Sequence, residues 1–345
     1  MKGFAFYIIA AALCLAQPLP ARAEVLPREE TALKKSSYTL GPVQVREKYI
    51  SMTGPVLTDK VSLGTDTPVW VKGFRVDVVD AKGEKESSEY LCHSWLTLGK
   101  PEAGDQKMLT ISEGLEEMSF PPGFAVRVEA KPDNAALLAQ VLNNNEKTDK
   151  NLAYKLTVNY IDDATARQFG VRPLRTVSVA IMAKDANPEG GSEICRTQDE
   201  IGEPMPAAPG AAKSVVHFDV PPGRHEYRSV VPKESPLYLG GTIHYIKLHL
   251  HPYGESVALL DKTTGKEVWS GRVRTGAGRA ILTDIDFYSS VEGIKIDTTH
   301  DYEVVSVYNN TTDKLTDAMA VLRVYVSDDS APRAEEKPTA APSAK

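Results

Sequence analysis

The sequence predicts an all-β protein made of two tandem antiparallel β-sandwiches. Short runs rich in Val, Ile, Tyr, Phe and Thr alternate with Gly, Pro, Asn and Asp turns, and long helical spacings are missing. The chain of 345 residues is also long enough for two domains of ordinary size. The expected strands lie within residues 70–79, 90–98, 124–128, 154–160, 176–182, 214–220, 245–251, 257–260, 302–308 and 319–326.

The first 23 residues have the pattern of a secretory signal peptide. Lys2 supplies the positive start, residues 4–16 form an apolar stretch, and Ala21-Arg22-Ala23 is a small-residue cleavage signal. The apolar stretch is too short for a good membrane span, and no other segment approaches one. We therefore expect an exported protein, periplasmic or secreted, without a membrane span.

Composition divides the mature chain. Residues 196–213 hold prolines, alanines and glycines without apolar periodicity and are interpreted as a linker. The expected domains are therefore an N-terminal sandwich over 24–195 and a C-terminal sandwich over 214–328. Residues 329–345 form a Pro/Ala/Lys/Glu tail that cannot bury a core, so disorder is expected there.

Charge and cysteine content limit the possible partners. A net charge of −6 without a basic stripe argues against a nucleic-acid partner. Cys92 and Cys195 remain after removal of the leader. An oxidising compartment permits a disulfide between them, and a thiolate at Cys92 is the alternative.

His249 and His251 form the most informative pair in the chain. Residues i and i+2 of a strand project from one face, about 6.6–6.8 Å apart, so both imidazoles can converge on one metal ion. The alternate residues Ile246, Leu248 and Leu250 are apolar and predict the core face. The two histidines are therefore expected on the face turned away from the core.

Met319 follows the same pattern in a later strand. It shares a predicted face with Arg323, while the opposite face is apolar throughout. Imidazole and thioether together form a soft donor set that selects copper, and the sulfur favours Cu(I). The predicted site is one copper ion held by His249, His251 and Met319.

Two groups of motifs resemble a known family. The segments HLHPYG (249–254) and DAM (317–319) resemble the second domain of copper type II, ascorbate-dependent monooxygenases, of which peptidylglycine α-hydroxylating monooxygenases are the best-known members. The segments FRVDVVD (74–80) and EYLCHSW (89–95) resemble the first domain, particularly that of plant stress-up-regulated nodulin-19 proteins. The resemblance implies two jelly-roll-like sandwiches with a solvent-filled cleft between them and one copper in each.

The resemblance also implies that the first copper site is degenerate. The family's first domain uses an adjacent His pair and a third His to hold an electron-delivering copper. The pair falls on Cys92-His93 and the third ligand on Asn143, so His93 is the one imidazole that remains. The family's reaction needs two electrons and one copper supplies one, so copper binding without the full reaction is expected.

The other histidines receive lesser roles. His244 falls on the apolar face and is interpreted as a hydrogen-bonded core residue, although a bulge before His249 would make it a further ligand. His300 lies in a turn, where a supporting or surface role is expected. His217 and His225 bracket a Pro-Pro-Gly turn and are interpreted as structural.

Three functions remain open from the sequence. The leading hypothesis is an exported protein that binds or handles copper. The second is a copper-dependent monooxygenase that draws electrons from a small reductant or an envelope protein. The third is a metal-free interaction module of the envelope.

Overall fold

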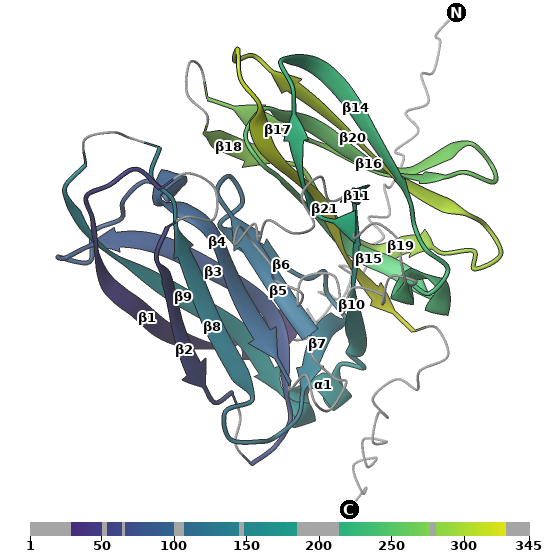
Figure 1. The fold of residues 1–345 in the computed structure, drawn as a ribbon. Coiled ribbons are helices and arrows are strands. Elements are labelled where there is room, and N and C mark those ends of the chain that lie inside the picture. Colours follow the sequence, from purple (N-terminus) through teal and green to yellow (C-terminus); the bar gives the residue numbers. More distant parts are fainter. Residues whose placement is uncertain are drawn as a thin grey trace, which may run out of the picture.

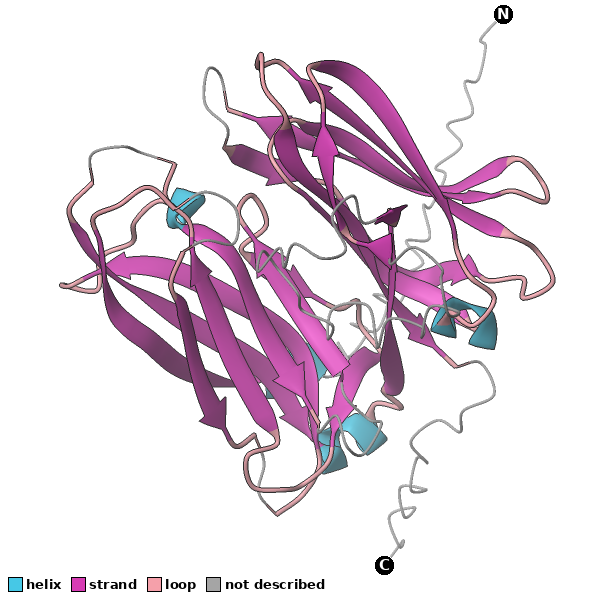
Figure 2. Cartoon of the chain, viewed as in Figure 1, coloured by secondary structure: helices cyan, strands magenta, loops and turns pink. Residues whose placement is uncertain are grey.

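The computed structural model describes residues 29–49, 54–63, 66–99, 107–144, 148–184, 214–276 and 281–328. The predicted signal peptide, the predicted linker 196–213, the tail 329–345 and Cys195 lie outside these residues. Figure 2 shows that strands make up most of the described chain. The all-β prediction is confirmed, and each of the ten segments expected to form a strand contributes to one.

The first sandwich consists of two facing sheets. One sheet has the order β1 (Lys34–Val45), β9 (Lys150–Asp162), β3 (Val69–Asp80), β7 (Phe124–Val128), and the short β6 (Glu117–Ser119) pairs with β3. The facing sheet has the order β2 (Val56–Val61), β8 (Ala135–Val141), β4 (Leu91–Leu98), β5 (Lys107–Ser112). Apart from β6, this is the strand order of a jelly roll.

The second sandwich repeats this order. Along one sheet run β13 (His217–Val220), β21 (Thr316–Ser327), β15 (Thr242–Leu250), β19 (Phe287–Lys295). The facing sheet contains β14 (Gly223–Val230), β20 (Tyr302–Asn310), β16 (Gly254–Asp261), β17 (Lys266–Thr275), β18 (Leu282–Ile285). Two jelly rolls therefore stand in tandem, as Figure 1 shows.

Strand β10 (Arg172–Ala180) joins the two sandwiches into one sheet. Its first residues pair with β7 in parallel, Arg172 with Phe124 and Pro173 with Ala125. From Leu174 onward it pairs antiparallel with β21. The result is a single ten-stranded sheet that passes through both sandwiches (Figure 1). A separate ladder pairs β11 (Ala183–Lys184) with β12 (Ser214–Val215).

Helical structure is confined to short segments. The described residues contain the 3-10 turns η1 (Glu29–Ala32), η2 (Ser88–Tyr90) and η5 (Pro236–Leu239) and the helix α1 (Asp163–Gln168). Helix α1 begins where the side chain of Asp162 accepts a hydrogen bond from the backbone N–H of Thr165, a normal N-cap. None of the helices among the described residues is long and apolar enough to cross a membrane.

Each sandwich encloses its own hydrophobic core. The second core receives the predicted apolar faces of β15 and β21, and Val177 and Val179 of β10 join it. It therefore draws on residues that precede and follow the predicted linker. The residues from β15 and β21 are Ile243, Ile246, Leu248, Leu250, Ala318, Ala320, Leu322, Val324 and Val326.

The opposite face of β15 and β21 packs against the first sandwich and is not open to solvent. The ammonium of Lys247 donates to the carbonyl of Thr110 on β5 at 2.7 Å, and the hydroxyl of Tyr325 donates to the carbonyl of Met108 at 3.2 Å. Lys247 is 1% exposed. The face that the sequence turned away from the core thus lies at a packed, polar interface. In the described part of this face Lys247 and Tyr325 are buried, where the family resemblance implied a solvent-filled cleft.

Candidate metal centre

His249 of β15 and His251, which follows the end of this strand, lie on its interface side, as their spacing predicted. His249 stands opposite Val321 of β21, and the backbone N–H of His251 donates to the carbonyl of Met319 at 3.3 Å. The intervening Leu250 enters the second core. Strand alternation therefore fixes both imidazoles on one side of the sheet.

His93 completes a cluster of three imidazoles. It comes from β4 of the first sandwich, and its Nε2 atom lies 2.9 Å from Nε2 of His249. The two ring centroids are 4.3 Å apart. One nitrogen from each of His93, His249 and His251 lies within 4.8 Å of the others, so the three could hold one metal ion. The cluster joins the two sandwiches.

The distance between Nε2 of His93 and Nε2 of His249 is that of a hydrogen bond, and it is close to the distance between two nitrogens that share one metal ion. Two nitrogens on one tetrahedral zinc-sized ion, at about 2.0–2.1 Å from the metal, lie about 3.3 Å apart. The His93–His249 separation of 2.9 Å would need to widen by a few tenths of an ångström. The Nδ1 atom of His249 is buried and has no hydrogen-bond partner among the described residues. No second hydrogen bond among the described residues therefore holds this ring against such a shift.

The electrostatics keep the imidazoles of His93 and His249 neutral. Burial is the main cause that lowers the pKa of His93 and His249 well below the usual value. The neighbouring imidazoles and the ammonium of Lys247 lower both pKa values further. Metal binding requires an unprotonated imidazole, so His93 and His249 present the form that coordinates.

Asp317 binds the Nδ1 atom of His251, the ring nitrogen that the proposed metal would not use. One carboxylate oxygen lies 2.9 Å from Nδ1 of His251 and the other lies 2.9 Å from Nδ1 of His217. Partial burial alone would raise the pKa of Asp317, but these two hydrogen bonds hold it far below its usual range. An ionised carboxylate only accepts, so both rings donate from Nδ1 and keep Nε2 for a metal.

Cys92 contacts the other nitrogen of His93. Its sulfur lies 3.1 Å from Nδ1 of His93, and the side chain is buried. When this nitrogen carries the proton, Nε2 is left as the coordinating atom. Cys195 lies outside the described residues, so the Cys92–Cys195 disulfide stays a prediction.

Met319 lies beside the cluster on β21. It shares the interface face with Val321 and Arg323, as predicted, yet it is fully buried in a small cluster with Ala180 and Val321. The strand register places it across from His251 on one side and across from His217 on the other. In the strand register Met319 is therefore next to His217 and His251.

The remaining candidates lie elsewhere. His244 sits at a bulge in β15, where Ser290 and Ser327 bind its two nitrogens at 3.0 Å each and Phe124 stacks on its ring. His300 pairs with Asp261 at 2.7 Å. Asn143 donates from its amide to the carbonyl of Glu47. Neither of these two histidines belongs to a possible metal group within the described chain.

Two residues of the site have contacts in the structure that differ from those expected from the sequence. The family resemblance assigned His93 to a separate first site, yet its Nε2 atom lies 2.9 Å from that of His249. His217 was interpreted as structural, yet it binds Asp317. The sequence feature that could have indicated this position of His217 is its alternation with Phe218 and Val220, which enter the core and leave His217 on the other face.

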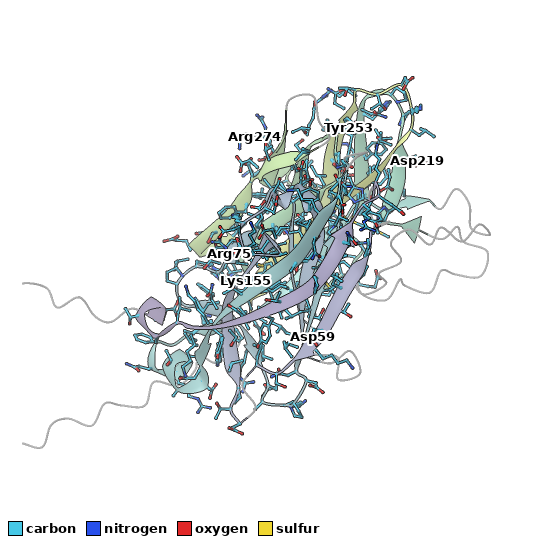
Figure 3. The ribbon with its side chains drawn as sticks, turned by 90° about the vertical axis from the view of Figure 1, so that its left-hand side faces the viewer. Asp59, Arg75, Lys155, Asp219, Tyr253 and Arg274 are labelled. Carbon is cyan, nitrogen blue, oxygen red and sulfur yellow. The ribbon has the colours of Figure 1, made fainter. Side chains whose placement is uncertain are left out.

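In Figure 3 the labelled Asp219 and Tyr253, two residues beyond His217 and His251, both lie in the upper half of the view.

Comparisons with known proteins give likenesses of fold only. No family model and no curated protein matches the chain. The structure of the STIV MCP is similar with a TM-score of 0.34 and 9% identity, covering 85% of this chain and 96% of that one. PNGase F, a glycosylasparaginase from Flavobacterium meningosepticum, is similar with a TM-score of 0.35 and 7% identity, covering 85% and 96%. At these scores, the jelly-roll assignment rests on the strand order alone.

Proposed function

We propose that this is an exported protein that binds one copper ion tightly between its two sandwiches and acts in copper binding or handling. The ligands are His93, His249 and His251. The observation that supports this most strongly is that one nitrogen from each of the three rings lies within 4.8 Å of the others. The signal-peptide pattern of residues 1–23 supports export.

Donor chemistry favours copper over other metals. Imidazoles suit zinc, copper, iron and nickel, and among divalent first-row ions copper binds most tightly to a given site. The sulfur of Cys92 contacts the ring of His93, and Met319 pairs with His217 in the strand register. Soft donors near the site favour copper, Cu(I) above all. The resemblance to copper monooxygenases points the same way.

A copper-dependent monooxygenase is the second candidate. Three protein ligands leave a coordination position open, as in catalytic metal sites. The resemblance implies two separate coppers, however, and here His93 lies against His249 in one cluster. One copper supplies one electron, so catalysis would need an external reductant or an envelope partner. Substrate-dependent oxygen uptake by the copper-loaded protein with ascorbate would favour the enzyme over the binding protein.

Copper titration of the mature apoprotein tests the proposal. Under anaerobic conditions with a competing Cu(I) chelator, we expect one tight equivalent, retained in the presence of excess zinc. The variant His249→Ala/His251→Ala is expected to lose it. The matched control is His225→Ala/His300→Ala, which removes two histidines outside the cluster and should bind normally. Tight binding that survives the first double substitution would refute the site, and a wild type that binds no metal would favour an interaction module.

A further inference from the structure

A β-bulge in β4 turns Cys92 toward His93. Leu91 and His93 pair with consecutive residues of β8, so Cys92 is an extra residue in its strand. Leu91 and Leu96 both enter the first core although an odd number of positions separates them, which strict alternation would not allow. The bulge accounts for this break in alternation, and it brings the sulfur of Cys92 against Nδ1 of His93. Neighbouring residues of a regular strand face opposite sides, so this contact depends on the bulge.

A chain of hydrogen-bond contacts runs from Cys92 through His93 to His249. The sulfur lies 3.1 Å from Nδ1 of His93, and Nε2 of that ring lies 2.9 Å from Nε2 of His249. Because burial lowers the pKa of both rings well below the usual value, each imidazole is neutral and carries one proton. A single proton fits between the two Nε2 atoms. The position of the proton on His93 therefore fixes the position of the proton on His249.

Two arrangements of these protons satisfy both contacts. In the first, His93 donates from Nδ1 to the sulfur of Cys92, and His249 donates from Nε2 to His93. In the second, the thiol donates to His93, and the proton of His249 lies on Nδ1. That nitrogen of His249 is buried and has no hydrogen-bond partner among the described residues. Among buried backbone groups, N–H donors without a partner are rarer than acceptors without one, and the same preference favours the first arrangement.

We propose that Cys92 is a positioning residue of the copper site, because its sulfur accepts the Nδ1 proton of His93 and keeps Nε2 of that ring for the metal. This role rests on the proposed function, in which His93 is one of three ligands. An entering ion replaces the proton between the two Nε2 atoms. His249 loses that proton to solvent and takes one up on Nδ1, so its ring stays neutral. His93 already has the proton on the nitrogen that coordination requires.

Nitrogen NMR of the apoprotein with isotope-labelled histidine tests this arrangement without any metal. The ring spectra distinguish a proton on Nδ1 from one on Nε2, and His93→Gln and His249→Gln assign the signals. We expect the proton on Nδ1 in His93 and on Nε2 in His249. Cys92→Ser keeps an acceptor and should preserve this pattern, whereas Cys92→Val has no acceptor and should lose it. A proton on Nε2 of His93 in the wild type would overturn the proposal.

Chelator competition with Cu(I) measures what the contact does for the metal. Cys92→Val should bind copper about 10–100-fold more weakly than the wild type, the usual effect of losing a group that orients a ligand. Cys92→Ser should bind it nearly as tightly as the wild type, because its hydroxyl still accepts a hydrogen bond. The matched control is Ser94→Ala, which removes a buried hydroxyl of the same strand that bonds the carbonyl of Leu138. It should leave the copper affinity unchanged.

The two proposals can fail separately. Equal copper affinities in the wild type and Cys92→Val would overturn the positioning role and leave the three proposed ligands in place. Equal weakening in Cys92→Val and Ser94→Ala would also overturn it, since the effect would then come from the stability of the strand. A wild type without tight copper binding would remove the proposed function and this role with it. Near-ultraviolet circular dichroism checks the fold of each variant, and Cys92→Ala replaces Cys92→Val if the latter misfolds.

Discussion

Nε2 of His93 lies 2.9 Å from Nε2 of His249, although 156 residues separate them in the chain. One ring belongs to β4 of the first sandwich and the other to β15 of the second. A single hydrogen bond thus connects the two jelly rolls at the point where the proposed metal would bind. Both the metal affinity and the stability of the interface depend on this contact.

Substitution of His93 should weaken copper binding although the residue lies in the other sandwich. The variant His93→Ala removes one of three proposed ligands, so we expect the affinity for copper to fall by at least about 100-fold. Chelator competition measures the dissociation constant. A value within threefold of the wild type would show that His93 is only a neighbour of the site.

Copper should stabilise the two sandwiches together. A ligand that binds the folded state alone, at 100 times its dissociation constant, raises the free energy of unfolding by about 2.7 kcal/mol. We expect a single thermal transition that moves upward when copper is added, with little movement in His93→Ala. If copper shifted the melting temperature of both proteins equally, the ion would be bound elsewhere.

The apoprotein should become less stable as the pH falls below about 6.5. Burial, followed by neighbouring positive groups, lowers the pKa of His93 and His249 in the folded state, while the unfolded chain keeps the ordinary value near 6.5. Below that value the unfolded state binds more protons, so acid favours unfolding and stability recovers as the pH rises. Urea unfolding at pH 7.5 and 5.5 measures this loss. His249→Gln should show a smaller loss, and an equal or larger one would contradict the assignment.

Tyr308 ties together the strands that carry the ligands. Its buried hydroxyl donates to the carbonyl of Met319 at 2.6 Å and accepts from the backbone N–H of His251 at 3.2 Å. Tyr308→Phe should lower the free energy of unfolding by about 1–3 kcal/mol and weaken copper binding severalfold. Tyr302→Phe removes a comparable hydroxyl, bonded to Asp297, and should affect stability alone. Equal copper affinities in the two variants would exclude a role for Tyr308 in the site.

The carboxylate of Asp317 should matter through the orientation of the rings that it holds. Asp317→Asn replaces one accepting oxygen by a donor, so it cannot accept from both His217 and His251. We expect copper affinity to fall by about 10–100-fold, the usual effect of losing a group that orients a ligand. Asp219→Asn is the matched control, since Asp219 pairs with Asp317 in the strand register and is exposed. An unchanged affinity in Asp317→Asn would show that packing alone orients the rings.

Alternation along β15 and β21 could be predicted from the sequence because it depends on local pattern. Leu248 and Leu250 enter the second core, and His249 lies on the other face, as the pattern required. A polar face indicates only that a surface lies outside the core. It does not distinguish solvent from a polar interface, so the burial of Lys247 against the first sandwich could not be foreseen.

The convergence of His93 on the cluster depends on a contact that no local pattern encodes. The position of β4 relative to β15 follows from how one sandwich packs on the other, with β10 as the strand that pairs with both. Met319 shows the same limit. Its face was predicted, but its full burial follows from packing with Ala180, a residue that precedes the predicted linker.

Because β10 pairs with β7 of the first sandwich and with β21 of the second, the two sandwiches cannot be expressed as separate fragments without exposing a strand edge. A fragment that starts at residue 214 lacks β10, so β21 loses the partner of residues 321–327 and presents bare backbone donors and acceptors. Such an unprotected border recruits strands from other copies and promotes aggregation. A cut at 181–184 also leaves β10 with the first half, and so it exposes the same residues of β21.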